Sequence, residues 1–134
     1  MIFGEHNLNP EPQIKEWKDV EEYHTNIDLE LGKATKSLCD YSHCSIQLLQ
    51  KCIATLKIAK LIELSYGGVI TDEEWKDDSK EKFKIVPFKK GGFQVVRYYS
   101  IQHKDILSFR ERKLAEEFMS YESNRQLVEQ YFMM

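Results

Sequence analysis

The segment KFKIVPFKKGGFQVVRYYSI, residues 82–101, contains two runs of β-branched and aromatic residues on either side of the loop Lys89-Lys90-Gly91-Gly92. Both glycines can take positive φ angles without steric cost, and a glycine loop between two strand-like runs predicts a β-hairpin. Its packing partners must come from the helical segments that precede and follow it.

The register of this hairpin determines which side chains share a face. A four-residue loop predicts three cross-strand pairs: Phe88 with Phe93, Val86 with Val95, and Lys84 with Arg97. One face then carries apolar side chains that can lie on a helical layer, namely Phe83, Ile85, Val96 and Tyr98. The other face alternates apolar and basic side chains, namely Lys84, Val86, Phe88, Phe93, Val95, Arg97 and Tyr99. A slip of one residue would exchange these faces.

Further strands and short helices are indicated around the hairpin. Pro87 has no N–H group to donate, so we expect its strand at a sheet edge or with a bulge. A third strand is predicted at residues 105–109, and residues 27–31 are predicted to form a brief strand or an extended link. Thr71 and Glu74 have the spacing of a helix capping box, and so do Ser108 with Glu111 and Ser123 with Gln126.

The longest helical pattern covers residues 42–64 and ends at Gly67 and Gly68. We expect its core face to carry Leu49, Cys52, Ile53, Leu56 and Ala59, with a second apolar side in the last two turns made of Ile58, Leu61 and Ile62. A short helix is predicted at residues 12–24. Another is predicted with an apolar face of Leu114, Ala115, Phe118 and Met119, followed by a C-terminal helix that is either separate or a kinked continuation.

These elements predict an α+β fold, with a small antiparallel sheet of about three strands packed with three to five helices. With 134 residues the chain is long enough for one domain with its own core. We expect a flexible lead-in at residues 1–11 and a single domain at residues 12–134. No apolar run reaches the roughly 20 residues of a membrane span, and no leader pattern is visible, so we expect a cytoplasmic protein.

The charges are unevenly distributed. Residues 82–113 carry nine lysines or arginines and two acids, whereas residues 1–31 carry two lysines and eight acids. Such asymmetry indicates either an anionic partner or an acidic segment folded against a basic one. Charges dispersed over a solvated surface are the simpler interpretation.

Catalytic and metal-binding patterns are weak. Cys39, His43 and Cys44 are the candidate metal ligands, with Cys52 nearby, but the chain has no Cys-x2-Cys pair, so we expect no metal and no cofactor. Cys44 is the one candidate nucleophile, and adjacent residues on a helix point about 100° apart, so His43 would not activate it. We therefore expect that the protein is not an enzyme.

Four pieces of the chain resemble a loose class of small uncharacterised proteins encoded by gut-bacterial phages and mobile elements. The pieces are residues 53–64, Glu74-Trp75-Lys76-Asp77-Asp78, residues 82–88, and residues 107–118 with SFRERKLAEEF within them. The resemblance implies an origin, and it carries no activity and no site residues.

The basic and aromatic face of the hairpin has three interpretations. It can be buried under a helix with its charged tips at the rim, it can bind a protein, or it can stack the bases of single-stranded nucleic acid. The candidate binding surface comprises Lys84, Phe88, Lys89, Lys90, Phe93, Arg97, Tyr99, Arg110 and Arg112. We expect a non-enzymatic, host-modulating accessory protein of phage or mobile-element type that acts through a protein–protein surface or self-association. The alternative is a small nucleic-acid-binding protein that uses residues 82–101.

Overall fold

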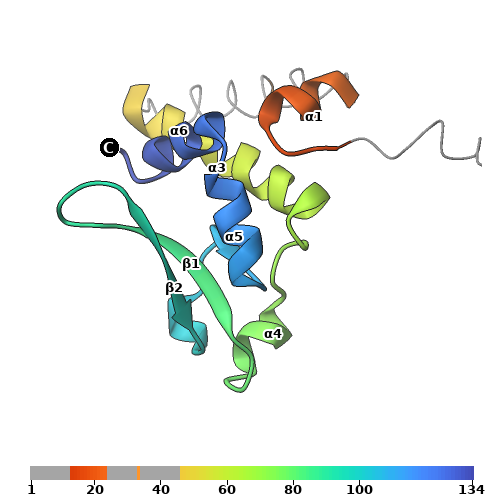
Figure 1. The fold of residues 1–134 in the computed structure, drawn as a ribbon, viewed down its shortest axis with the longest axis vertical. Coiled ribbons are helices and arrows are strands. Elements are labelled where there is room, and N and C mark those ends of the chain that lie inside the picture. The colour runs from red at the N-terminus through yellow and green to blue at the C-terminus, as the bar shows by residue number, and fades with distance from the viewer. Residues whose placement is uncertain (1–12, 24–32, 34–45) are drawn as a thin grey trace, which may run out of the picture.

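The computed structural model describes residues 13–23, 33 and 46–134, and Figure 1 shows how they are arranged. In chain order the elements are α1 (Trp17–Tyr23), α3 (Ile46–Ser65), α4 (Asp72–Lys76), β1 (Lys82–Pro87), β2 (Phe93–Tyr98), the 3-10 helix η2 (Ile101–His103), β3 (Ser108–Phe109), α5 (Arg112–Met119) and α6 (Glu122–Tyr131). The three strands form one antiparallel sheet in the order β2-β1-β3. The predicted α+β fold is therefore confirmed, whereas the predicted lead-in and the strand at residues 27–31 lie outside the described residues.

The hairpin of β1 and β2 differs from the predicted register by one residue. Pro87 pairs with Phe93 and Ile85 pairs with Val95, so the loop has five residues, 88–92, and not four. The loop closes through the Phe88 N–H, which donates to the Gly92 carbonyl at 2.9 Å. Burial selects this register, because it turns Phe93 and Val95 towards the core, whereas the predicted pairing would have turned them away from it.

Pro87 was predicted to lie on an edge strand or at a bulge, and both alternatives are wrong, because β1 is the central strand and its pairing with β2 is unbroken from Lys82 to Pro87. Its neighbour β3 is only two residues long and pairs with Phe83 and Lys84 alone. In an antiparallel ladder, successive residues direct their backbone N–H and C=O groups to opposite sides of the strand. The Phe88 N–H points to β2, because it donates to the Gly92 carbonyl, so the nitrogen of Pro87 points away from β2. Pro87 therefore lies where no ladder hydrogen bond is lost.

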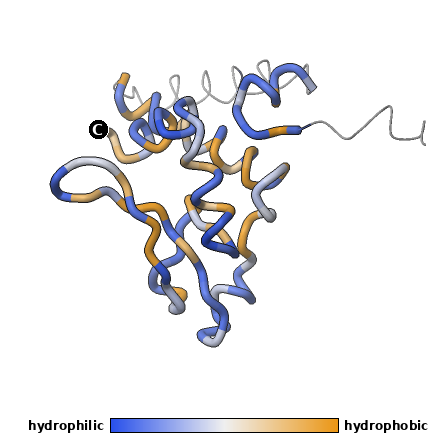
Figure 2. Tube along the Cα trace, in the orientation of Figure 1, coloured by the Kyte–Doolittle hydropathy of each residue, from blue (hydrophilic) through white to orange (hydrophobic). Residues whose placement is uncertain are grey.

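Of the two apolar sides predicted for α3, the core forms on the second, which carries Ile58, Leu61 and Ile62. The fully buried side chains of this helix are Ala54, Ile58, Leu61 and Ile62. Leu56, which belongs to the predicted core face, is 40% exposed, and Cys52 is only half-buried. The side chains of the last two turns thus determine which side of α3 packs. The other apolar side, to which Leu56 and Cys52 belong, remains partly exposed. In Figure 2 hydrophobic residues also run through both strands of the hairpin, while its loop and the region of α4 are hydrophilic.

Three aromatic rings join α5, β3 and the end of α3. Phe118 lies 5.1 Å from Tyr66 and 5.5 Å from Phe109 between ring centroids, and all three side chains are buried. The Tyr66 hydroxyl donates to the Lys15 carbonyl at 2.8 Å, and Asn124 donates to the same carbonyl at 2.9 Å. Burial raises the pKa of the Tyr66 hydroxyl above its ordinary value. The segment that leads into α1 is thereby fixed to the body of the fold.

The three capping-box predictions have different outcomes. The box of Thr71 and Glu74 is confirmed, with both reciprocal bonds at 3.2 Å. The box of Ser108 and Glu111 is wrong, because Ser108 lies in β3 and its hydroxyl donates to the Asp105 carbonyl at 2.7 Å. α6 is a separate helix that begins after Tyr121, so Ser123 lies inside it and does not cap it.

Candidate functional site

The nine residues of the predicted binding surface do not form one face in the structure. Phe93 lies on the core side of β2 and stacks on Phe132 with centroids 6.2 Å apart. Lys84 lies on the opposite side of the sheet, because the register places it across from Val96. Phe88, Lys89 and Lys90 are exposed in the loop. The surface expected from sequence is therefore divided between two sides of the sheet and the hairpin tip.

Two of the predicted cations are paired within the fold. The Lys84 ammonium lies 3.5 Å from the Asp105 carboxylate and 5.2 Å from the centroid of the Tyr98 ring. The Arg97 guanidinium lies 3.2 Å from the Glu81 carboxylate and packs over Tyr99, which is 40% exposed. Exposed ion pairs of this kind are weak, so Arg97 can be drawn to another partner at little cost.

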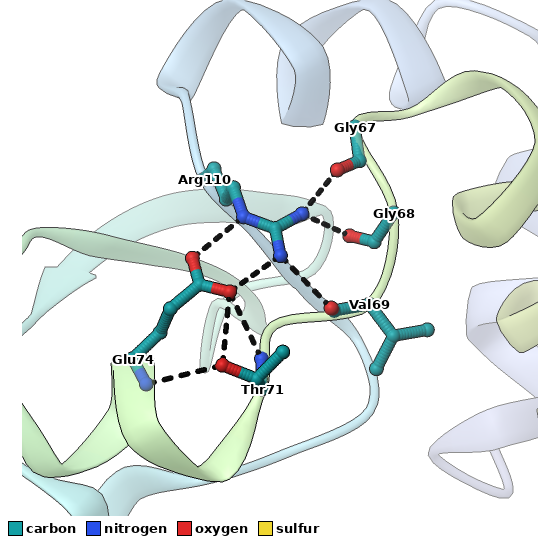
Figure 3. Close-up of polar contacts among 6 residues, drawn as sticks. All are labelled: Gly67, Gly68, Val69, Thr71, Glu74 and Arg110. Atoms are coloured by element: carbon teal, nitrogen blue, oxygen red, sulfur yellow. Dashed lines mark hydrogen bonds and ion pairs between the residues drawn. The ribbon is translucent and has the colours of Figure 1, made fainter.

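Arg110 forms a clamp between Glu74 and the backbone of residues 67–69 (Figure 3). Its Nε and Nη2 atoms donate to the two carboxylate oxygens of Glu74 at 2.7 and 2.5 Å. Nη1 donates to the carbonyls of Gly67 and Gly68, and Nη2 donates also to the carbonyl of Val69 at 3.0 Å. A guanidinium has five N–H donors, and these contacts use all of them. Arg110 thus closes the loop after α3 onto α4, and it has no donor left for a partner.

The same clamp makes the pKa of Glu74 unusual. Hydrogen bonds from Arg110 lower it from 4.5 to about 2, with burial opposing and bonds from Thr71 assisting this shift. Because the folded pKa lies below the unfolded one, the stabilisation is present above pH 4.5 and is lost as the pH falls towards 2.

We expect Glu74→Gln to remove part of the acid sensitivity of the fold. Between pH 6 and 3 the wild type should lose about 1–2 kcal/mol more unfolding free energy than the variant does, a value reduced by solvent screening of a partly exposed pair. Urea unfolding at both pH values measures this difference. Glu73→Gln, an exposed neighbour in the same helix, should behave as the wild type. Equal losses in wild type and Glu74→Gln would contradict the assignment.

Sequence patterns did not reveal the role of Lys82, which is 1% exposed. Its ammonium donates to the carbonyls of Tyr99 at 2.6 Å, Asp77 at 2.7 Å and Trp75 at 3.4 Å, and it lies 5.6 Å from the centroid of the Trp75 ring. Three carbonyl oxygens match the three donors of an ammonium group, so the buried charge is solvated by backbone. Lys82 therefore fixes the base of the hairpin to α4.

The outer edge of β2 has no neighbouring strand in the described part of the chain. Along an antiparallel pair, every second residue of a strand forms hydrogen bonds to the neighbouring strand. Gly92 is one of the bonded residues, because its carbonyl accepts from the Phe88 N–H, so Phe93 is not. The backbone N–H and C=O groups of Phe93, Val95 and Arg97 consequently point away from β1, and we call these groups the β2 edge. One of them is already engaged, since Arg112 Nη1 donates to the Val95 carbonyl at 3.1 Å.

A groove of about 300 Å³ lies beside the β2 edge, between β2 and α5. Residues of the hairpin form one wall and residues of one face of α5 form the other: Ile85, Phe93, Gln94 and Val95, and Arg112, Glu116 and Met119. Beside the groove, the Arg112 guanidinium packs 5.3 Å from the centroid of the Phe83 ring. We call this hollow the β2–α5 groove. It combines apolar side chains, charged groups and a strand edge.

Two other hollows are less suited to a ligand. One of about 320 Å³ is lined by Arg110, Lys82 and Glu74, whose donors and acceptors are used within the fold, together with Ile70, Lys80 and Glu81. The other, of about 300 Å³, lies on the open side of α3 and is lined by Leu48, Lys51, Cys52, Thr55 and Leu56. Its two polar side chains are engaged within the fold, since the Lys51 ammonium lies over the Tyr131 ring and the Thr55 hydroxyl donates to the Lys51 carbonyl.

The metal candidates Cys39, His43 and Cys44 lie outside the described residues. Among residues 13–23, 33 and 46–134, no three histidines, cysteines or acids are grouped so that they could hold a metal ion. Within the same residues, every helix is too short or too polar to cross a membrane.

Comparison of the chain with family models, curated proteins and solved structures finds no match. The resemblance to phage and mobile-element proteins thus stays a prediction.

Proposed function

We propose that this protein is a non-enzymatic binding protein that holds a partner protein through the β2 edge. The observation that supports this most strongly is that Phe93, Val95 and Arg97 direct their backbone groups away from β1, with no strand beside them in the described residues. Free N–H and C=O groups on a sheet edge are a template to which an extended peptide adds as a further strand.

The β2–α5 groove supports the same proposal. In strand addition the main chain supplies hydrogen bonds, while pockets for alternate side chains supply specificity. Arg112 and Met119 lie seven residues apart on α5, which corresponds to about 10 Å along the helix axis. About three residues of an extended peptide have that length, so the groove is matched to a short segment of a partner.

An accessory, host-modulating role is the broader setting that we propose for this binding. Strand addition needs only one exposed segment in the partner. The proposal requires no catalytic group.

A nucleic-acid-binding function is the second proposal, and the hairpin tip favours it. Phe88 is 47% exposed and is followed by exposed Lys89 and Lys90. Base stacking on an aromatic ring beside lysines is a mode of single-strand binding. Against it, Lys84 and Arg110 are engaged by acids of the fold, which leaves fewer cations for phosphates.

We expect that selection from a library of random dodecapeptides on immobilised wild-type protein yields related extended peptides. Their affinity should fall at least about tenfold in Arg97→Pro relative to Arg97→Ala. Both variants lose the same side chain, but only proline removes the N–H group that points to the ligand. Fluorescence anisotropy with labelled peptide measures the affinities, and thermal unfolding verifies that both variants are folded.

Equal affinities of the two variants, or a selection without related peptides, would contradict strand addition at β2. The nucleic-acid proposal is tested on a column of single-stranded thymidine oligonucleotide. Retention that decreases with salt and is lost in the double variant Lys89→Ala, Lys90→Ala would favour that function instead.

A further inference from the structure

We infer that the β2 edge binds an acidic, apolar peptide segment and that Arg112 selects it. This inference rests on the proposed function and specifies the chemistry of the partner. In outline, one apolar side chain of the segment enters the β2–α5 groove, and a carboxylate two residues away meets Arg112.

Charge determines which occupant fits the β2 edge. Arg97 and Arg112 flank it, and the adjoining loop adds exposed Lys89 and Lys90. Among the described residues, the acids that ion-pair contacts or the groove lining place beside these cations are Glu81, which is paired with Arg97, and Glu116 in the groove. A second copy of this chain would bring the same cations to the same edge, and like charges repel. An acidic segment of another protein is complementary to the edge.

The position of Arg112 gives it two roles. Its guanidinium donates to the Val95 carbonyl, which is the acceptor that a ligand N–H group would use. No acid of the described residues lies within ion-pair distance of Arg112, although Glu116 is one helical turn away. A ligand strand therefore displaces Arg112 from Val95, and a carboxylate on that strand gives the guanidinium a stronger, charge-assisted partner. A neutral strand has to displace Arg112 without this compensation.

Alternation along a strand determines the spacing in the ligand. Side chains two residues apart lie on the same side of an extended segment. The apolar side chain next to Phe93 and Met119 and the acid next to Arg112 must therefore be separated by one residue. Because the ligand can run in either direction, a symmetrical probe has the order Glu-Thr-Leu-Thr-Glu.

The test compares two blocked synthetic peptides, Ser-Glu-Thr-Leu-Thr-Glu-Ser and the same peptide with Gln in place of both Glu residues. Binding is followed by amide chemical shifts of the isotope-labelled full chain. We expect the Glu peptide to bind wild type about tenfold more tightly than the Gln peptide, which corresponds to about 1.4 kcal/mol. The shifts should concentrate at residues 93–97.

Arg112→Ala separates this inference from non-specific attraction. The variant should lose the preference for the Glu peptide, with an affinity ratio near one, and should bind the Gln peptide more tightly than wild type does because the Val95 carbonyl is free. Lys113→Ala removes one positive charge from the adjacent, exposed position and should keep the tenfold preference.

The outcomes distinguish the inference from the proposed function. If peptides from the library bind at residues 93–97 but Arg112→Ala leaves the Glu preference unchanged, the role of Arg112 is wrong and strand addition stands. If Lys113→Ala abolishes the preference as Arg112→Ala does, the attraction is general and the selection by Arg112 is wrong. If neither the library peptides nor the two synthetic peptides bind, both proposals are overturned. Concentration-dependent shifts in the free protein at residues 93–97 would assign the edge to a second copy and would also overturn the acidic ligand.

Discussion

Replacement of Phe118 by alanine is expected to cost about 3–5 kcal/mol of unfolding free energy. The ring is fully buried and touches Tyr66 and Phe109, so its removal leaves a cavity where three elements meet. Many domains have a total stability of about 5–15 kcal/mol, and the variant should be close to unfolding at physiological temperature. Urea unfolding measures the loss, and Phe118→Leu should show a smaller one because it leaves a smaller cavity.

Phe88→Ala is the matched control for this experiment. Phe88 belongs to the same residue type but lies exposed in the hairpin loop, so its replacement should change stability by less than about 0.5 kcal/mol. Similar losses for Phe118→Ala and Phe88→Ala would show that the assignment of the core is wrong.

Arg110→Ala is expected to cost about 3 kcal/mol, because it leaves the carbonyls of residues 67–69 without this donor and the Glu74 carboxylate with only its bonds from Thr71. Arg110→Lys should recover only part of this, since an ammonium cannot reproduce the planar fork that binds both carboxylate oxygens. Thermal unfolding of the three proteins at neutral pH provides the comparison.

Lys113→Ala serves as the charge-matched control for Arg110→Ala. Its side chain is exposed and lies 3.6 Å from Glu111, a surface pair that contributes little. A stability of Arg110→Ala within about 0.5 kcal/mol of the wild type would contradict the clamp and would return Arg110 to the candidate binding residues.

Elements with strong local signals were predictable from the sequence. The glycine loop indicated the hairpin, and the spacing of Thr71 and Glu74 indicated the start of α4, because both depend on contacts between residues close in the chain. The register of the hairpin was not predictable in this way. It depends on the core that receives Phe93 and Val95, and that core is built from distant segments.

In the candidate site, too, features that depend on nearby residues were predictable and features that depend on distant residues were not. Composition indicated a basic segment at residues 82–113, but it could not reveal which of its cations have internal partners. Arg110 is engaged by Glu74, 36 residues earlier, and Lys82 by a carbonyl 17 residues later. No short motif encodes such contacts, and the groove beside β2 depends on the position of α5, which sequence spacing does not determine.

The carbonyl cage around Lys82 also bears on covalent modification of the protein. Acetylation and other amine chemistry need a lysine that a reagent or an enzyme can reach. Lys89 and Lys90 are open to such reactions in the native fold, whereas Lys82 becomes reactive only when the base of the hairpin separates from α4. Acylation of Lys82 would therefore show that the molecule had opened at this point, because the folded protein does not expose this amine.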